Sequence, residues 1–136
     1  DVAGGAFGNE RFHVDPRLPS RLGDLRYQNW VRSSLEHPTQ RLHALRDGRE
    51  LVAFFVTEQL PDGTCYWYLN AVAPNRQGRG YGLRAWRAMM NQARLEGATR
   101  VRTSIVARNH RVLNLYARLG FSFPAPSMTF HRVRLA

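Results

Sequence analysis

The stretch APNRQGRGYGLRAW, residues 73–86, places three glycines within five positions between a strand-like run and a helix-like run. Glycine tolerates positive φ and lets a ligand come close to the backbone. The N-terminus of a helix that follows such a turn presents unpaired N–H groups, and these bind phosphate together with the helix dipole. Arg76 and Arg79 can add charge-assisted hydrogen bonds. The segment predicts a diphosphate cradle, with a solvated glycine-rich turn as the structural alternative.

Two common phosphate motifs do not fit this stretch. The nucleotide P-loop requires a lysine followed by Ser or Thr, and all twenty basic residues of the chain are arginines. The dinucleotide fingerprint requires G-x-G-x-x-G, whereas Gly78, Gly80 and Gly82 follow G-x-G-x-G. The cradle is therefore of another type.

Hydrophobic spacing and turn residues divide the chain into helices and strands. Apolar residues at three- and four-residue spacing predict helices, and short apolar runs between turn signals predict strands. The predicted elements are a helix in 22–38, strands over 41–47, 50–60 and 65–73, a helix from 83 that ends at Gly97, a strand over 101–106, a helix in 108–120 that closes at Gly120, and one or two strands within 121–135. The order predicts a single α/β domain over 1–136, with a helical segment over 1–38 and a core sheet over 39–136.

Composition excludes several classes of protein. No apolar run approaches the roughly 20 residues of a membrane span. Cys65 is the only cysteine, so no internal disulfide forms, and the five histidines lack metal-ligand spacing. We expect a soluble cytoplasmic protein without a metal. The net charge of +10 favours polyanions, but the arginines are scattered over every predicted element. A nucleic-acid-binding module stays the alternative from another functional class.

Two motifs together resemble a known family. VAPNRQGRGYG matches the pattern Q/R-x-x-G-x-G/A, and NHRVLNLYARLGF, residues 109–121, is similar to N-x-x-A-x-x-L-Y-x-x-x-G-F, with Val112 in the place of Ala. These are signatures of the GNAT superfamily of N-acetyltransferases. The resemblance implies a mixed, mainly antiparallel sheet flanked by helices, with acetyl-CoA as the cofactor.

The same resemblance implies roles for individual residues. The backbone of the turn would hold the CoA pyrophosphate; its residues are Arg76, Gln77, Gly78, Arg79, Gly80, Tyr81 and Gly82. Strand residues Asn70, Ala71 and Val72 would pair with the pantetheine arm, and Asn109 would contact it. Tyr116 would be the general acid that protonates the departing thiolate. A tyrosine with a pKa near ~10 keeps its proton at neutral pH, which suits this role.

We expect the first forty residues to help form the acceptor pocket. The run RFHVDPRLP, the run RYQNWVRSSL and the closing SMTFHRVRL resemble dTDP-sugar N-acetyltransferases, especially the dTDP-fucosamine type; the matched positions of the first two runs are Arg11, Phe12, Asp15, Tyr27, Trp30 and Ser34. We expect a small amine acceptor, best a nucleotide-activated amino sugar, bound by Phe12, Tyr27, Trp30 and Tyr68. Peptide and aminoglycoside acceptors stay open. Candidate general bases are Glu58, Asp15 and His43, directly or through water.

One departure from the family concerns the beginning of the chain. The family usually begins with a strand, whereas this chain opens with DVAGGAFGNERF, which has no strand-like run. We expect the first strand to lie upstream of Asp1. The expected partners are a small-molecule acceptor and neither nucleic acid nor membrane, with a homodimer left open.

Overall fold

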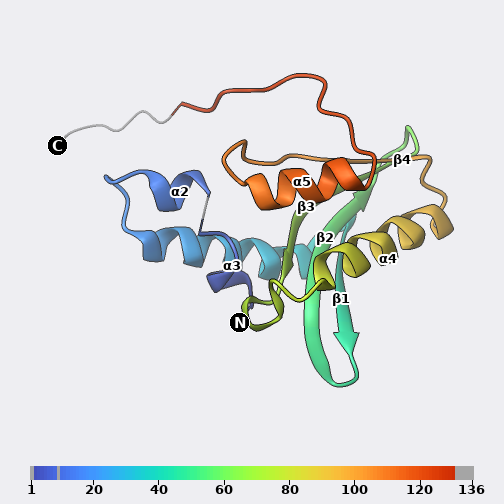
Figure 1. The fold of residues 1–136 in the computed structure, drawn as a ribbon, viewed down its shortest axis with the longest axis horizontal. Coiled ribbons are helices and arrows are strands. Elements are labelled where there is room, and N and C mark those ends of the chain that lie inside the picture. The colour runs from blue at the N-terminus through green and yellow to red at the C-terminus, as the bar shows by residue number, and fades with distance from the viewer. Residues whose placement is uncertain (1, 9, 131–136) are drawn as a thin grey trace.

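The computed structural model describes residues 2–8 and 10–130 and centres on a four-stranded sheet with the strand order β1-β2-β3-β4 (Figure 1). Strands β1 (Gln40–Asp47), β2 (Glu50–Gln59) and β3 (Thr64–Val72) form an antiparallel meander. Strand β4 (Arg100–Thr103) lies parallel to β3. The predicted mixed, mainly antiparallel sheet is confirmed.

Helices cover both faces of this sheet. The helical elements are α1 (Val2–Gly5), α2 (Arg11–Val14), α3 (Ser20–Glu36), the 3-10 turn η1 (Pro74–Arg76), α4 (Tyr81–Leu95) and α5 (His110–Arg118). On one face, Tyr27 of α3 packs in a core with Phe54 and Leu69. On the other face, Trp86 of α4 and Tyr116 of α5 belong to a second core. The sheet therefore separates an α3 side from an α4/α5 side.

A β-bulge at Tyr68 changes which side chains of β3 face each core. Val56 lies opposite Leu69 and Thr57 lies opposite Trp67, so Tyr68 has no residue opposite it in β2. Before the bulge, Trp67 packs in the α4/α5 core, whereas Leu69 packs in the α3 core. A bulge inserts one residue and redirects the side chains around it. Asn70 consequently faces the α4/α5 side.

The edge of β3 that faces away from β2 is paired along only half of its length. The parallel ladder with β4 runs from Thr64 opposite Arg100 to Trp67 opposite Thr103 and ends there. The Thr103 hydroxyl donates to the Trp67 carbonyl at 2.9 Å and so closes the ladder. In the part of the chain that the structure describes, no strand pairs with residues 68–72 on this side. Unpaired N–H and C=O groups on a strand edge can accept an extended partner.

Two sequence expectations for the strands need correction. β4 ends at Thr103, three residues before the predicted end. Within the described residues 121–130 there is no strand, and residues 131–135 lie outside the described part. Pro124 and Pro126 cannot donate to a ladder, residues 122–130 are all exposed, and among the described residues no strand pairs with this segment.

The N-terminal residues begin with a helical turn. The described residues before Glu10 contain α1 and no strand. Among the residues that the structure describes, no helix has both the length and the apolar character that crossing a membrane requires.

Candidate active site

The turn between β3 and α4 forms an open cradle. Gly78 and Gly80 have φ of +76° and +78°, and Gly80 is the N-cap of α4. Within the described chain, no side chain caps α4, so the N–H groups of its first turn stay available. A Cβ built on either glycine would have no atom within 4 Å, which leaves the cradle open. The site fits an anionic group at a helix N-terminus.

Two side chains of the turn anchor it to the sheet. Gln77 donates from Nε2 to the Val72 carbonyl at 3.2 Å. The Arg76 guanidinium forms an ion pair with Glu50 and lies 5.6 Å from the centroid of the Tyr81 ring. The sequence predicted Arg76 as a diphosphate ligand, whereas the structure directs its side chain to β2. Arg79 is exposed and makes no hydrogen bond or ion pair with any described residue.

Tyr116 lies beside the unpaired edge of β3. Its hydroxyl donates to Oδ1 of Asn70 at 3.3 Å, across 46 residues of sequence. The ring is 2% exposed and packs edge-on against Trp86 and Phe121. Burial raises the pKa of Tyr116, and polar groups of Trp86, Thr103 and Asn70 offset part of that rise. A buried phenol that keeps its proton can donate it to a leaving group, and the role of Tyr116 as general acid stays a prediction.

The other predicted residues of the cofactor site divide between the edge and α5. Ala71 is buried and Val72 is half-buried, and both belong to the unpaired part of β3. Asn109 is the N-cap of α5, where its side chain accepts a hydrogen bond from the Val112 N–H at 3.4 Å. This capping explains an asparagine at that position without any ligand. Contact of Asn109 with a pantetheine arm stays a prediction.

The three candidate bases lie in different parts of the fold. Glu58 accepts hydrogen bonds from Thr39 and from Tyr68, the latter at 2.8 Å, and these two donors lower the pKa of its carboxyl. Asp15 accepts two side-chain hydrogen bonds from Arg17.

The third candidate, His43, is separated from the edge of β3. It lies opposite Phe55, which lies opposite Asn70, so two strand spacings, about 10 Å, separate it from Asn70. Glu58 contacts a predicted acceptor residue, because Tyr68 donates to it.

On the α3 side, aromatic side chains lead toward the same edge. We call Phe12, Arg26, Trp30, Tyr68 and Tyr66 the aromatic row. The Arg26 guanidinium lies 4.5 Å from the centroid of Phe12 and 5.6 Å from that of Trp30. The Trp30 and Tyr68 rings are 6.4 Å apart, and those of Tyr68 and Tyr66 are 4.7 Å apart. The row passes the bulge at Tyr68, two residues from Asn70, and ends at Tyr66.

One predicted acceptor residue lies apart from this row. Tyr27 is 5% exposed and stacks on Phe7 with 4.4 Å between ring centroids. Burial raises its pKa to about 12. Tyr27 therefore packs α1 and α3 onto the sheet, whereas Phe12, Trp30 and Tyr68 lie half-buried in the row.

Sequence reasoning missed Arg26 and Tyr66. Arg26 precedes Trp30 by four residues, so both lie on one face of a helix, and this spacing could have revealed the pair. Tyr66 precedes Tyr68 by two residues, which also indicates a shared strand face before the bulge is considered. The bulge itself had no sequence signal.

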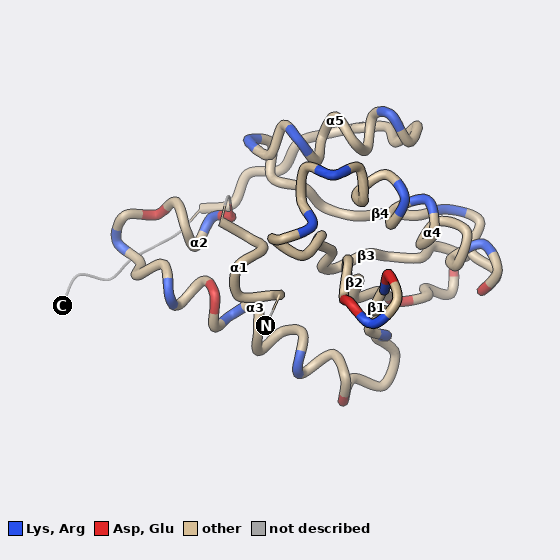
Figure 2. The backbone as a smooth tube through the Cα atoms, turned by 60° about the horizontal axis from the view of Figure 1, so that its bottom comes forward, with Lys and Arg blue, Asp and Glu red and all other residues tan. Residues whose placement is uncertain are grey.

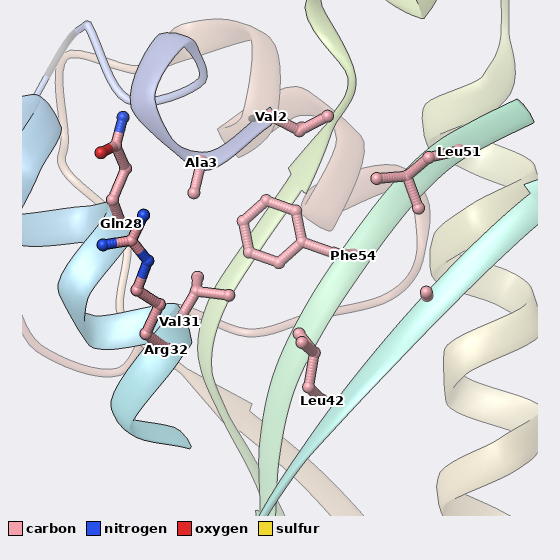
Figure 3. Close-up of a pocket in the computed structure, with 9 residues that line it drawn as sticks. Val2, Ala3, Gln28, Val31, Arg32, Leu42, Leu51 and Phe54 are labelled. Atoms are coloured by element: carbon pink, nitrogen blue, oxygen red, sulfur yellow. The ribbon is translucent and has the colours of Figure 1, made fainter. Parts of the chain in front are cut away.

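A separate cavity of about 210 Å³ lies between the helices and the first two strands (Figure 3). Its main apolar lining is Val2, Ala3, Val31, Leu42, Leu51 and Phe54. It lacks acidic or histidine side chains and does not include the edge of β3. Within the described residues, no three His, Cys, Asp or Glu side chains converge as a metal site would require. The cavity and the edge of β3 are therefore separate features of the fold.

Comparison with models of known families decides the affiliation. Residues 8–121 match the model of the acetyltransferase (GNAT) family. The chain belongs to this family. GNAT acetyltransferases use acetyl-CoA. In this chain, the unpaired edge of β3 and the glycine cradle at the N-terminus of α4 could hold that cofactor. A comparison with curated protein sequences finds no significant match.

Solved structures share the fold of this GNAT acetyltransferase. YycN of Bacillus subtilis has a TM-score of 0.71 and 20% identity, with 90% of this chain and 80% of that chain covered. A Bacillus subtilis acetyltransferase in complex with CoA has a TM-score of 0.65 and 22% identity, covering 74% and 64%. The ribosomal-protein-S18-alanine N-acetyltransferase of Escherichia coli has a TM-score of 0.60 and 20% identity, covering 68% and 59%.

Proposed function

We propose that this acetyltransferase transfers an acetyl group from acetyl-CoA to the primary amine of a nucleotide-activated amino sugar. One observation carries the proposal. The unpaired edge of β3, residues 68–72, has the glycine cradle at its end, Tyr116 on the α4/α5 side and the aromatic row on the α3 side. A donor and an acceptor can thus approach one strand edge from opposite faces.

The cofactor site would use backbone groups more than side chains. The N–H groups of residues 78–82 would hold the pyrophosphate, because they lie at an uncapped helix N-terminus. Arg79 would add a charge-assisted hydrogen bond. Asn70, Ala71 and Val72 would offer backbone groups to the amides of the pantetheine arm, in the manner of an added strand.

Each residue at the edge has a chemical task in this proposal. Bound acetyl-CoA supplies an activated acetyl thioester. Tyr116 holds the proton that the sulfur needs when its bond to the acetyl carbon breaks, and Asn70 fixes the direction of that hydroxyl. The aromatic row holds the acceptor so that its free amine meets the acetyl carbon in one ternary complex. The amine proton leaves to water, and water returns a proton to Tyr116.

The acceptor class follows from the surface of the row. Aromatic faces bind sugar rings and bases, and Arg26 within the row is a cation that suits an anionic acceptor. An aminoglycoside acetyltransferase, meta-AAC0020 from a soil metagenomic sample, and the ribosomal-protein acetyltransferase have the same fold, so cationic sugars and peptides belong in the same test.

A nucleic-acid-binding function finds less support. Figure 2 shows the arginines spread over α3, α4, α5 and the loops rather than gathered on one face. Acidic residues interrupt them, as in the ion pairs of Arg17 with Asp15 and of Arg76 with Glu50. A nucleic-acid interface usually concentrates its basic residues in one patch or stripe.

The test is acetyl-CoA consumption with a panel of amines: a nucleoside-diphosphate amino sugar, the free amino sugar, an aminoglycoside and a peptide with a free N-terminus. We expect the highest kcat/KM with the nucleotide-linked sugar, and mass spectrometry should find one acetyl group on its amine. A preference for the peptide or the aminoglycoside would overturn the acceptor class. No acetyl transfer to any amine would overturn the reaction itself.

A further inference from the structure

Two arginines near the start of the aromatic row share one aromatic ring. The guanidinium carbons of Arg11 and Arg26 lie 4.9 Å and 4.5 Å from the centroid of Phe12. Arg26 also lies over Trp30 at 5.6 Å. Rings that cover the faces of a guanidinium leave its N–H groups free along the edges. The aromatic row thus positions Arg26 without using its hydrogen-bond donors.

The charge of Arg26 is not compensated by any described carboxylate. Arg26 is exposed and makes no hydrogen bond or ion pair with a described residue. The acidic neighbours have other partners, since Asp24 pairs with His13 and Asp15 pairs with Arg17. Arg11 donates to the Thr129 hydroxyl at 3.3 Å and has Glu10 beside it, without an ion pair between them in the described chain. Two guanidinium groups around one ring make this end of the aromatic row cationic, which favours an anionic ligand there.

We propose that Arg11 and Arg26 bind the diphosphate of the acceptor and so determine its specificity. This inference rests on the proposed acetyl transfer and names the group by which the acceptor is recognised. A guanidinium binds phosphate oxygens in a bidentate manner, and the planar fork is already held by Phe12 and Trp30. From there, Trp30 and Tyr68 lead to the β3 edge, where the amine would react. The diphosphate is thus bound at the Phe12 end of the row, and the sugar extends from it toward the β3 edge.

The experiment compares UDP-glucosamine with glucosamine, which carry the same amine with and without a diphosphate. We expect Arg26→Ala to raise KM for UDP-glucosamine by about 10- to 50-fold, the effect of losing a charge-assisted hydrogen bond. kcat for UDP-glucosamine should stay within about twofold, and KM for glucosamine should rise at least about fivefold less than KM for UDP-glucosamine, because glucosamine has no diphosphate. Arg26→Lys should restore part of the affinity, because it keeps the charge and loses the fork. Arg32→Ala, an exposed arginine of the same helix, is the matched control.

A binding measurement separates this inference from the reaction. Titration calorimetry with UDP on the CoA-saturated protein should show binding that Arg26→Ala weakens by at least about tenfold. If UDP binds through Arg26 but no amine is acetylated, the diphosphate site stands and the proposed function fails. The inference is overturned if wild type does not bind UDP, or if Arg26→Ala changes UDP-glucosamine and glucosamine alike.

Discussion

At the scale of single residues, Glu58 shows how hydrogen bonds change the chemistry of a carboxylate. Hydroxyls of Thr39 and Tyr68 donate to its two oxygens, which lowers the pKa of Glu58, and the same contact raises the pKa of Tyr68. A carboxylate with a lowered pKa is a weaker base. We infer that Glu58 orients the ring of Tyr68 for the acceptor, and that a sugar amine enters already unprotonated.

This account predicts a small effect for Glu58→Gln. The amide oxygen can still accept the hydrogen bond from Tyr68, so kcat should fall by less than about fivefold, whereas loss of a general base costs about 100-fold or more. Glu58→Ala removes the acceptor of that bond and should raise KM for the amine more than Glu58→Gln does. Steady-state rates with the best acceptor of the panel measure both. A hundredfold loss of kcat in Glu58→Gln would make Glu58 the base.

At the scale of elements, the turn from β3 into α4 decides cofactor binding through its glycines. Gly80 and Gly48 both have positive φ, +78° and +60°, and both have open space where a Cβ would stand. Each change to alanine should therefore destabilise the fold by a similar amount, about 1–2 kcal/mol. Gly80→Ala alone should also weaken acetyl-CoA binding, because its methyl group stands at the helix N-terminus. Calorimetric titration with acetyl-CoA, beside denaturant unfolding, measures both effects.

Equal acetyl-CoA affinity in the Gly80 and Gly48 variants would contradict this assignment. The Gly48 variant is a suitable control because Gly48 lies in the β1–β2 turn, outside the cradle. Its loss of stability shows what backbone strain does without any change at the cofactor site.

Periodicity predicted most of these elements, and its failures have physical causes. Leu83, Trp86, Met90 and Ala93 repeat at helical spacing, and all four lie in α4, which buries Trp86 and Ala93. The run CYWYLNAVA is apolar at almost every position, so it cannot show that Tyr68 is a bulge. The tail contains strand-like alternation, but a strand also needs a neighbour with which to pair, and residues 121–130 have none in the described chain.

At the scale of the whole molecule, the site joins residues from distant parts of the chain. The family resemblance implied roles for Asn70 and Tyr116, and the fold brings their side chains into contact. The sequence could not show that Arg76 pairs with Glu50, because the β1–β2 hairpin must first dock against the turn. It also could not separate Trp30 in the row from buried Tyr27, since both are aromatic residues of one helix.

The sheet also predicts a pH dependence of stability. His43 is half-buried, its Nε2 lies 3.0 Å from the Thr57 hydroxyl, and burial lowers its pKa below the ordinary 6.5. Because the unfolded chain then binds the proton more tightly, stability is full above about pH 6.5 and falls as the pH drops toward the folded pKa. Thermal unfolding from pH 7.5 to 5.5 should show a falling Tm.

His43→Gln should flatten that fall, because no proton is then taken up at this position. The control is His37→Gln, at an exposed histidine before β1. An unchanged slope of Tm against pH in His43→Gln would show that other groups cause the dependence.

The most direct test of the central claim is the steady-state rate of Tyr116→Phe at saturating acetyl-CoA. The variant loses only the hydroxyl that donates to Asn70, so the ring still packs in its core. We predict a loss in kcat of about 100-fold or more, the usual effect of removing a general acid, with KM for acetyl-CoA within about twofold. Tyr81→Phe, which loses a hydroxyl bonded to Asp47, should keep nearly the wild-type kcat. Wild-type turnover in folded Tyr116→Phe would contradict the assignment of the proton source.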